Sequence, residues 1–175
     1  MKKLLTILML SAAVCLGATA KPSAQKPIKP ATSAQLKTFV SLYAKSDSAM
    51  MRGDARYLNA ILAPDFASRA FSGRTSNRAQ RVRNVTMLFR KIKINASTTA
   101  IERLGFRGKQ ALTVVLGDGT FVMSGVDGKP HRIRLVVRST DTWISTNRGW
   151  LLQSTVETQG RQFIDGREVP IGQKL

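Results

Sequence analysis

Apolar residues in the first half of the chain recur three or four positions apart, which predicts helices. In the longest such stretch the apolar positions are Leu36, Phe39, Val40, Tyr43, Met50 and Met51. Ser33 is predicted to cap the start of this helix, and Gly53 is typical of a residue that ends one. Asp54 is expected to cap a second, short helix, which Pro64 stops.

A short strand is predicted at residues 65–71, ahead of a third helix that begins at Thr75 or Ser76. The apolar stripe of the third helix comprises Val82, Val85, Phe89 and Ile92. The other faces of the same helix hold Arg78, Arg81, Arg83, Arg90 and Lys91.

From Lys93 onward the pattern is typical of a sheet, with strands near 93–104, 109–124, 130–145 and 149–159. Asp127-Gly128 is a strong hairpin signal, and Asp165-Gly166 is expected to turn a last small hairpin. The stretch 117–119, Gly-Asp-Gly, predicts a bulge or kink within one long strand. Helices followed by strands indicate an α+β fold, in which three N-terminal helices pack on a curved, mostly antiparallel sheet around a pocket.

Residues 1–20 have the pattern of a signal peptide: Lys2 and Lys3, a short apolar run, and Ala18-Thr19-Ala20. A lipoprotein anchored at Cys15 is the alternative, disfavoured by the bulky Val14 before it. Residues 21–32 are predicted to be a Pro/Lys-rich linker, 33–160 the folded domain, and 161–175 a C-terminal hairpin or tail. We therefore expect an exported protein, periplasmic or extracellular, with no transmembrane anchor after cleavage.

The chain is strongly basic, with 28 Lys and Arg against 10 Asp and Glu and a net charge of +18. This favours anionic partners, although the charge is spread along the chain, as in a generic basic surface. Arg132, Arg134 and Arg138 share one strand face and are predicted to form an anion-binding surface. Nucleic acid is disfavoured because that face offers no aromatic residue for stacking. Repulsion between these cations across an interface predicts a monomer or a weak homodimer.

The sequence lacks the residues that most catalytic mechanisms and cofactors require. Cys15, the only cysteine, lies in the predicted signal peptide, so the mature chain has no cysteine nucleophile. His131 is the only histidine and is expected at the solvated rim, beside the hairpin turn. No cluster of metal ligands and no glycine-rich phosphate loop occurs. The sequence therefore predicts no metal and no cofactor.

Four short motifs occur in an order and spacing that resemble the nuclear transport factor 2-like superfamily. They are Gly53-Asp54, Asp65-Phe66, Asp141-Thr142-Trp143 and Gly149-Trp150. The resemblance covers about residues 34–159, and the last hairpin is similar to that of the SnoaL-like and ketosteroid-isomerase-like branches. It implies a cone-shaped α+β fold with a pocket, often in a homodimer. The superfamily includes enzymes, ligand binders and assembly modules, so the fold does not define the function.

The resemblance also implies where catalytic groups would lie. Isomerase-like relatives have a Tyr on the first helix, an Asp base on the first strand and a second Asp on a late strand. Asp141 matches the last position, but Ser46 and Ala70 take the other two and cannot transfer a proton. Tyr43, one turn before Ser46, substitutes only in part.

The predicted ligand-binding residues are Tyr43, Asp47, Phe89, Asp141 and Trp143. Asp47 follows Tyr43 by four positions and is expected to be either a polar group of the pocket or an edge residue paired with a surface arginine. The sequence favours an exported, non-catalytic pocket domain that binds a small apolar or amphipathic ligand or acts as an assembly module. One alternative is a SnoaL-like cyclase, isomerase or dehydratase using Asp141 with Tyr43 or Asp47. Another is an electrostatic binder of an anionic envelope polymer.

Overall fold

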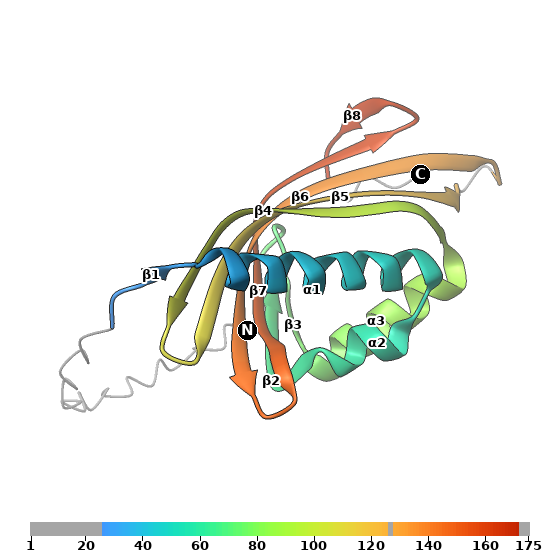
Figure 1. Ribbon diagram of the computed structural model, residues 1–175. Helices are drawn as coiled ribbons and strands as arrows, with labels where there is room; N and C mark the ends of the chain where they lie inside the picture. Colours follow the sequence, from blue (N-terminus) through green and yellow to red (C-terminus); the bar gives the residue numbers. More distant parts are fainter. Residues whose placement is uncertain (1–25, 126–127, 172–175) are drawn as a thin grey trace, which may run out of the picture.

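The computed structural model describes residues 26–125 and 128–171, which form one sheet with its helices on a single face (Figure 1). The helices are α1 (Ser33–Arg52), α2 (Ala55–Ala60) and α3 (Arg78–Lys91). The predicted signal peptide, residues 1–20, and Asp127 of the predicted hairpin turn lie outside the described residues. None of the helices described is long and apolar enough to cross a membrane.

Helix α1 begins one residue earlier than predicted. Thr32, not Ser33, is its N-cap, and the Thr32 hydroxyl accepts a hydrogen bond from the Gln35 N–H while the Gln35 side chain accepts from the Thr32 N–H. A glutamine three positions after the cap completes this reciprocal pair, which Ser33 could not form with Leu36. The C-terminal predictions are confirmed: Gly53 has a φ of 67°, and the Asp54 carboxylate accepts from the Tyr57 N–H at 3.0 Å.

The predicted start of the third helix at Thr75 or Ser76 is wrong. Residues Thr75–Asn77 form strand β3, which pairs antiparallel with β2 (Leu62–Arg69), and Asn77 caps α3 in a second reciprocal pair with Gln80. Backbone pairing with β2 keeps these residues extended until Asn77, which then satisfies the first free N–H groups of the helix.

The remaining strands are β1 (Lys29–Pro30), β4 (Lys93–Arg107), β5 (Gln110–Ser124), β6 (Pro130–Thr146), β7 (Gly149–Ile164) and β8 (Arg167–Val169). Over the residues described, the strand order is β1-β4-β5-β6-β7-β2-β3, with β8 pairing with β7. Only the β2–β7 pair is parallel within this part of the chain. The predicted α+β class, with helices on a mostly antiparallel sheet, is confirmed. β1 also shows that part of the predicted linker pairs with the sheet.

The register shifts of the sheet lie in the β4–β5, β6–β7 and β2–β7 pairs, and none interrupts the β5–β6 pairing at the Gly-Asp-Gly stretch. β5 is one continuous strand through residues 117–119, and its register with β6 runs unbroken there. The predicted bulge in that stretch is therefore wrong. The β4–β5 register shifts instead between Ile94 and Ala96 and between Ile101 and Arg103. Extra residues of this kind bend and twist a strand, so β4 curves over α1.

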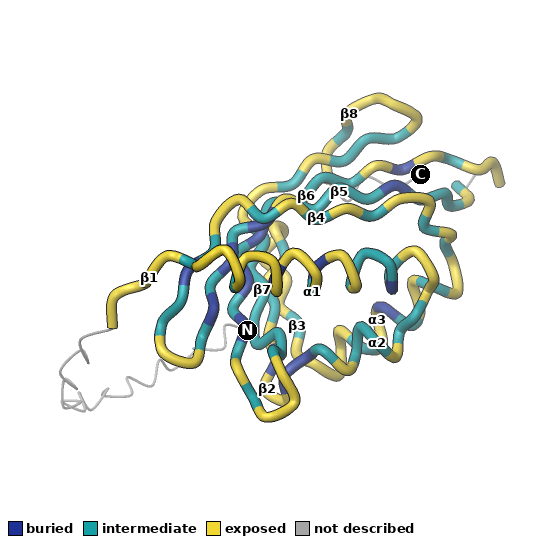
Figure 2. Tube along the Cα trace, in the orientation of Figure 1, coloured by how far each residue is buried: buried dark blue, intermediate teal, exposed yellow. Residues whose placement is uncertain are grey.

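The hydrophobic core lies where α1 crosses the sheet (Figure 2). Phe39 and Trp143 are each 1% exposed, and their rings meet edge to face at 5.9 Å between centroids. Trp150 also contacts Phe39, at 5.2 Å, so both tryptophans of the chain join one aromatic cluster. This cluster fixes α1 against the strands that carry the site described next.

Candidate functional site

A cavity of about 330 Å³ lies between the helices and the concave face of the sheet. Small-molecule sites in proteins span roughly 300–1,000 Å³, so this one is at the small end. Residues that alternate along the central strands face it, because every second side chain points to the same side of a sheet. On β5 these are Val115 and Gly117, and on β6 they are Val137, Ser139, Asp141 and Trp143.

Four of the five predicted ligand-binding residues line this cavity: Tyr43, Asp47, Asp141 and Trp143. Phe89 is not among the lining residues. It lies beside Gly53 at the end of α1, where a Cβ on residue 53 would come within 3.7 Å of the Phe89 ring. Phe89 therefore contacts the turn between α1 and α2.

Asp141 and Tyr43 form the centre of a buried polar network. The Tyr43 hydroxyl donates to Asp141 Oδ2 at 2.8 Å and accepts from Trp143 Nε1 at 3.0 Å. The Thr113 hydroxyl lies 2.6 Å from it and must donate, because the single Tyr43 proton goes to Asp141. Ser139 and Thr155 also hydrogen-bond Asp141. Asp141 is 5% exposed, and both of its carboxylate oxygens accept from neighbouring side chains.

Burial raises the pKa of Asp141 above its ordinary value, while hydrogen bonds from Tyr43, Thr155 and Ser139 and the charge of Arg81 oppose the rise. Burial, followed by the negative charge of Asp141, raises the pKa of Tyr43 well above its ordinary value. The Tyr43 hydroxyl therefore stays protonated and acts as a fixed donor to the carboxylate.

The raised pKa of Asp141 predicts a pH-dependent stability. The folded state holds this proton more tightly than the unfolded state, so the Asp141 contribution is full below the ordinary pKa of 3.8 and is lost as pH rises through the raised pKa. Asp141→Asn cannot titrate. We expect the difference in free energy of unfolding, variant minus wild type, to become more positive as pH rises through this interval. Urea titrations at a series of pH values measure it, and a constant difference would contradict the raised pKa.

Asp47 has different partners from those expected. Its Oδ1 accepts hydrogen bonds from Ser97 and Thr99 of β4, each at 2.9 Å. No arginine pairs with Asp47 in the described part of the chain, so the predicted surface ion pair is not formed there. These bonds join α1 to β4 at the cavity wall, consistent with the expected polar group of the pocket.

The sequence did not single out the cationic residues of the cavity. Arg81 and Val85 of α3 lie one turn apart and both line it, together with Arg69 and Arg74 from the exposed β2–β3 hairpin. Arg81 is exposed and lines the cavity. Neighbouring protein atoms displace part of the water around its guanidinium, which lowers its pKa, while Glu157 and Asp141 act in the opposite direction. A guanidinium stays charged even with a lowered pKa.

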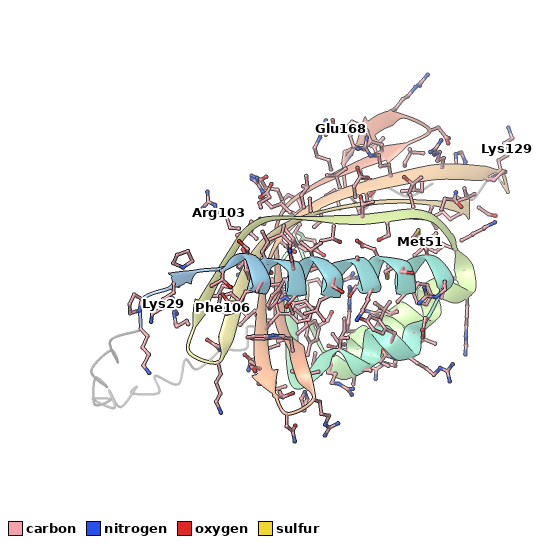
Figure 3. The ribbon with its side chains drawn as sticks, in the orientation of Figure 1. Lys29, Met51, Arg103, Phe106, Lys129 and Glu168 are labelled. Atoms are coloured by element: carbon pink, nitrogen blue, oxygen red, sulfur yellow. The ribbon has the colours of Figure 1, made fainter. Side chains whose placement is uncertain are left out.

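The predicted anion-binding arginines lie on the opposite, convex face of the sheet, where ion pairs engage two of them. Arg134 binds Asp118 and Arg138 binds Glu102, each with a shortest distance of 2.6 Å. Arg132 is exposed, and its backbone N–H donates to Asp165. In Figure 3, Arg103 and Glu168 mark this convex side, away from α1.

The expected repulsion between two copies of the protein assumed that the arginines of this face are unpaired. The ion pairs of Arg134 and Arg138 weaken that repulsion. They also weaken the case for an anionic polymer on this face, since each pair is locally neutral. A monomer or weak homodimer stays a prediction.

His131 lies near the β5–β6 turn, and its Nδ1 is 2.7 Å from Asp165 Oδ2. The predicted rim position fits its partial exposure, but the ring is engaged by a carboxylate rather than only by solvent. Residues 26–125 and 128–171 contain no group of three or more His, Cys, Asp or Glu side chains that could hold a metal ion.

Comparison with known proteins gives a fold match only. No family model matches the chain, and no curated protein matches it. Among solved structures, a conserved protein from Planctomyces limnophilus is 11% identical with a TM-score of 0.64, over 71% of this chain and 95% of that one.

Two further matches are named as nuclear transport factor 2-like proteins. One, from Rhodospirillum rubrum and of unknown function in nutrient uptake, is 21% identical with a TM-score of 0.54, over 69% of this chain and 95% of that one. The other, from Cytophaga hutchinsonii, is 12% identical with a TM-score of 0.53, over 73% and 98%. Identities this low establish the fold alone. The protein therefore has the cone-shaped α+β fold of the nuclear transport factor 2-like superfamily, as the sequence resemblance implied.

Proposed function

We propose that this protein is an exported, non-catalytic pocket domain that binds a small amphipathic ligand. The observation that carries the proposal is the cavity itself, whose wall is apolar in part and polar in part. Met50, Leu58 and Leu152, which are partly exposed, offer apolar surface, whereas Asp47 and Arg81 offer charge. A few polar groups in a mainly apolar cleft are typical of ligand sites. Export rests on residues 1–20, and N-terminal sequencing of the mature protein, expected to begin at Lys21, tests it.

The groups that could transfer protons support binding over catalysis. Ser46 and Ala70, which take the positions of the Tyr and the base in isomerase-like relatives, both line the cavity. The Ser46 hydroxyl donates to the Leu42 carbonyl at 3.0 Å. Asp141 and Tyr43 already satisfy each other, Thr113 and Trp143, so a reacting group would have to displace these bonds.

A cavity-filling substitution tests ligand binding. Gly117 lines the cavity, and a Cβ there meets nothing closer than the Val137 carbonyl at 3.7 Å, which is ordinary contact. Gly117→Leu should therefore fold and occupy the space of a ligand. We expect it to bind the neutral fluorescent probe 1-aminoanthracene about tenfold more weakly than wild type, because the probe loses apolar contacts. Fluorescence titration measures this.

The matched control is Gly119→Leu, two residues further along the same strand. Gly119 is not among the lining residues, and a Cβ there comes no closer than 3.8 Å to the Ala96 carbonyl. It should leave probe affinity unchanged. Equal probe affinity in wild type and Gly117→Leu would contradict the cavity as the binding site.

A further inference from the structure

Three arginines line the cavity, Arg69, Arg74 and Arg81, and within the described part of the chain none of them forms a salt bridge. The Arg81 guanidinium makes no hydrogen bond or salt bridge within the described part of the chain. Three arginines of the convex face differ: Arg134, Arg138 and Arg161 each bind a carboxylate through two of their nitrogens. Arg81 is thus an exposed cation of the cavity wall whose donors are open to a ligand.

The two carboxylates whose charge acts on Arg81 already accept hydrogen bonds from other groups. Glu157 Oε2 accepts from the Phe71 N–H at 2.9 Å. Asp141 accepts from Tyr43, Ser139 and Thr155. Both exert a favourable charge on the guanidinium, yet neither forms an ion pair with it. An anion that enters the cavity would provide the missing acceptor.

The rest of the wall indicates the size and charge of that anion. Apolar surface from Met50 and Leu152 suits a hydrocarbon or aromatic body. Asp47, Asp141 and Glu157 also line the cavity, so a second negative charge on the ligand would be repelled. A guanidinium and a carboxylate match as planar, two-pronged partners. The exposed Arg69 and Arg74 on the β2–β3 hairpin would attract an anion towards the cavity.

We propose that the ligand of this cavity is a monocarboxylate with an apolar body, whose carboxylate pairs with Arg81. This inference rests on the proposed binding function and adds the chemical class of the ligand. Asn84, one turn after Arg81 and also in the wall, can donate to the second side of the same carboxylate.

The test compares 4-phenylbutyrate with its neutral amide and with a phosphate monoester of similar length, 2-phenylethyl phosphate, by isothermal titration calorimetry. Wild type should bind the carboxylate about tenfold to a hundredfold more tightly than the amide, as expected for charge-assisted hydrogen bonds. Arg81→Gln should lose this preference, and Arg81→Lys should restore part of it. The control is Arg83→Gln on the same helix, an exposed residue outside the cavity wall, which should leave the preference unchanged.

Each other outcome has a defined meaning. Equal binding of carboxylate and amide, or a preference that survives Arg81→Gln, would overturn the carboxylate assignment and leave the pocket function standing. Tighter binding of the phosphate ester would overturn the single-charge assignment. If neither these compounds nor 1-aminoanthracene bind wild type, the pocket function fails as well. Circular dichroism of each variant separates lost binding from lost fold.

Discussion

Replacing Trp143 with alanine is expected to lower the free energy of unfolding by about 4 kcal/mol, the largest effect of any substitution considered. Trp143 is 1% exposed, and its ring packs against both Phe39 and Tyr43, at 5.9 and 5.5 Å between centroids. The truncation leaves a void that close-packed neighbours fill only in part, and it also removes the N–H donor to the Tyr43 hydroxyl. Urea denaturation followed by circular dichroism measures the loss.

The control is Trp150→Ala, in the same aromatic cluster. Trp150 is only partly buried and lies near the β6–β7 turn. Its truncation removes less buried surface and should cost less. A Trp150→Ala cost equal to that of Trp143→Ala would mean that the centre of the core lies closer to the hairpin than the burial indicates.

Tyr43→Phe is expected to destabilise the protein by about 3 kcal/mol, although it deletes a single oxygen. Three buried groups lose their partner at once: Asp141 Oδ2, Trp143 Nε1 and the Thr113 hydroxyl. The bond to the carboxylate is the strongest of these, because its acceptor carries charge. Removing that bond also raises the pKa of Asp141 further, since the Tyr43 hydrogen bond lowers it. The loss should therefore be greater at neutral pH than below the ordinary pKa of 3.8.

Tyr57→Phe is the matched control for this substitution. Tyr57 is partly buried, and its hydroxyl interacts with Ser46 alone among the side chains that affect its pKa. Its loss should cost well under half as much and show no such pH dependence. Equal costs for the two variants, or a Tyr43→Phe cost independent of pH, would contradict the role assigned to the Tyr43–Asp141 pair.

Local patterns predicted most of the fold. The β4 to β7 strands follow from runs of β-branched and aromatic residues broken by glycine turns, and Gly53-Asp54 marked the boundary between α1 and α2. The start of α3 was misplaced because residues 75–77 hydrogen-bond to β2, a contact that a local pattern does not contain. The bulges of β4 were missed for a similar reason, since register is defined by two strands together.

Site residues were predicted correctly only where alternation along a strand or spacing along a helix was enough to place them on one face. Alternation along β6 placed Asp141 and Trp143 on one face, and the spacing of Tyr43 and Asp47 placed both on one side of α1. Arg81 was missed because it lies beside the apolar stripe of α3, not within it. Phe89 was assigned to the cavity from that stripe, but α3 spans both the cavity and the end of α1. Only the packing of α3 against other elements separates these two contacts.

The hydrogen bond from Tyr43 to Asp141 joins positions 98 residues apart. A helix near the start of the domain and a strand near its end must both be in place before the cavity exists, and chains dominated by such distant contacts fold slowly. A partly folded chain would therefore have no binding site. Any ligand that binds the completed cavity shifts the folding equilibrium towards the native state by mass action. A higher ligand concentration would then lower the fraction of unfolded chain that proteases can cut.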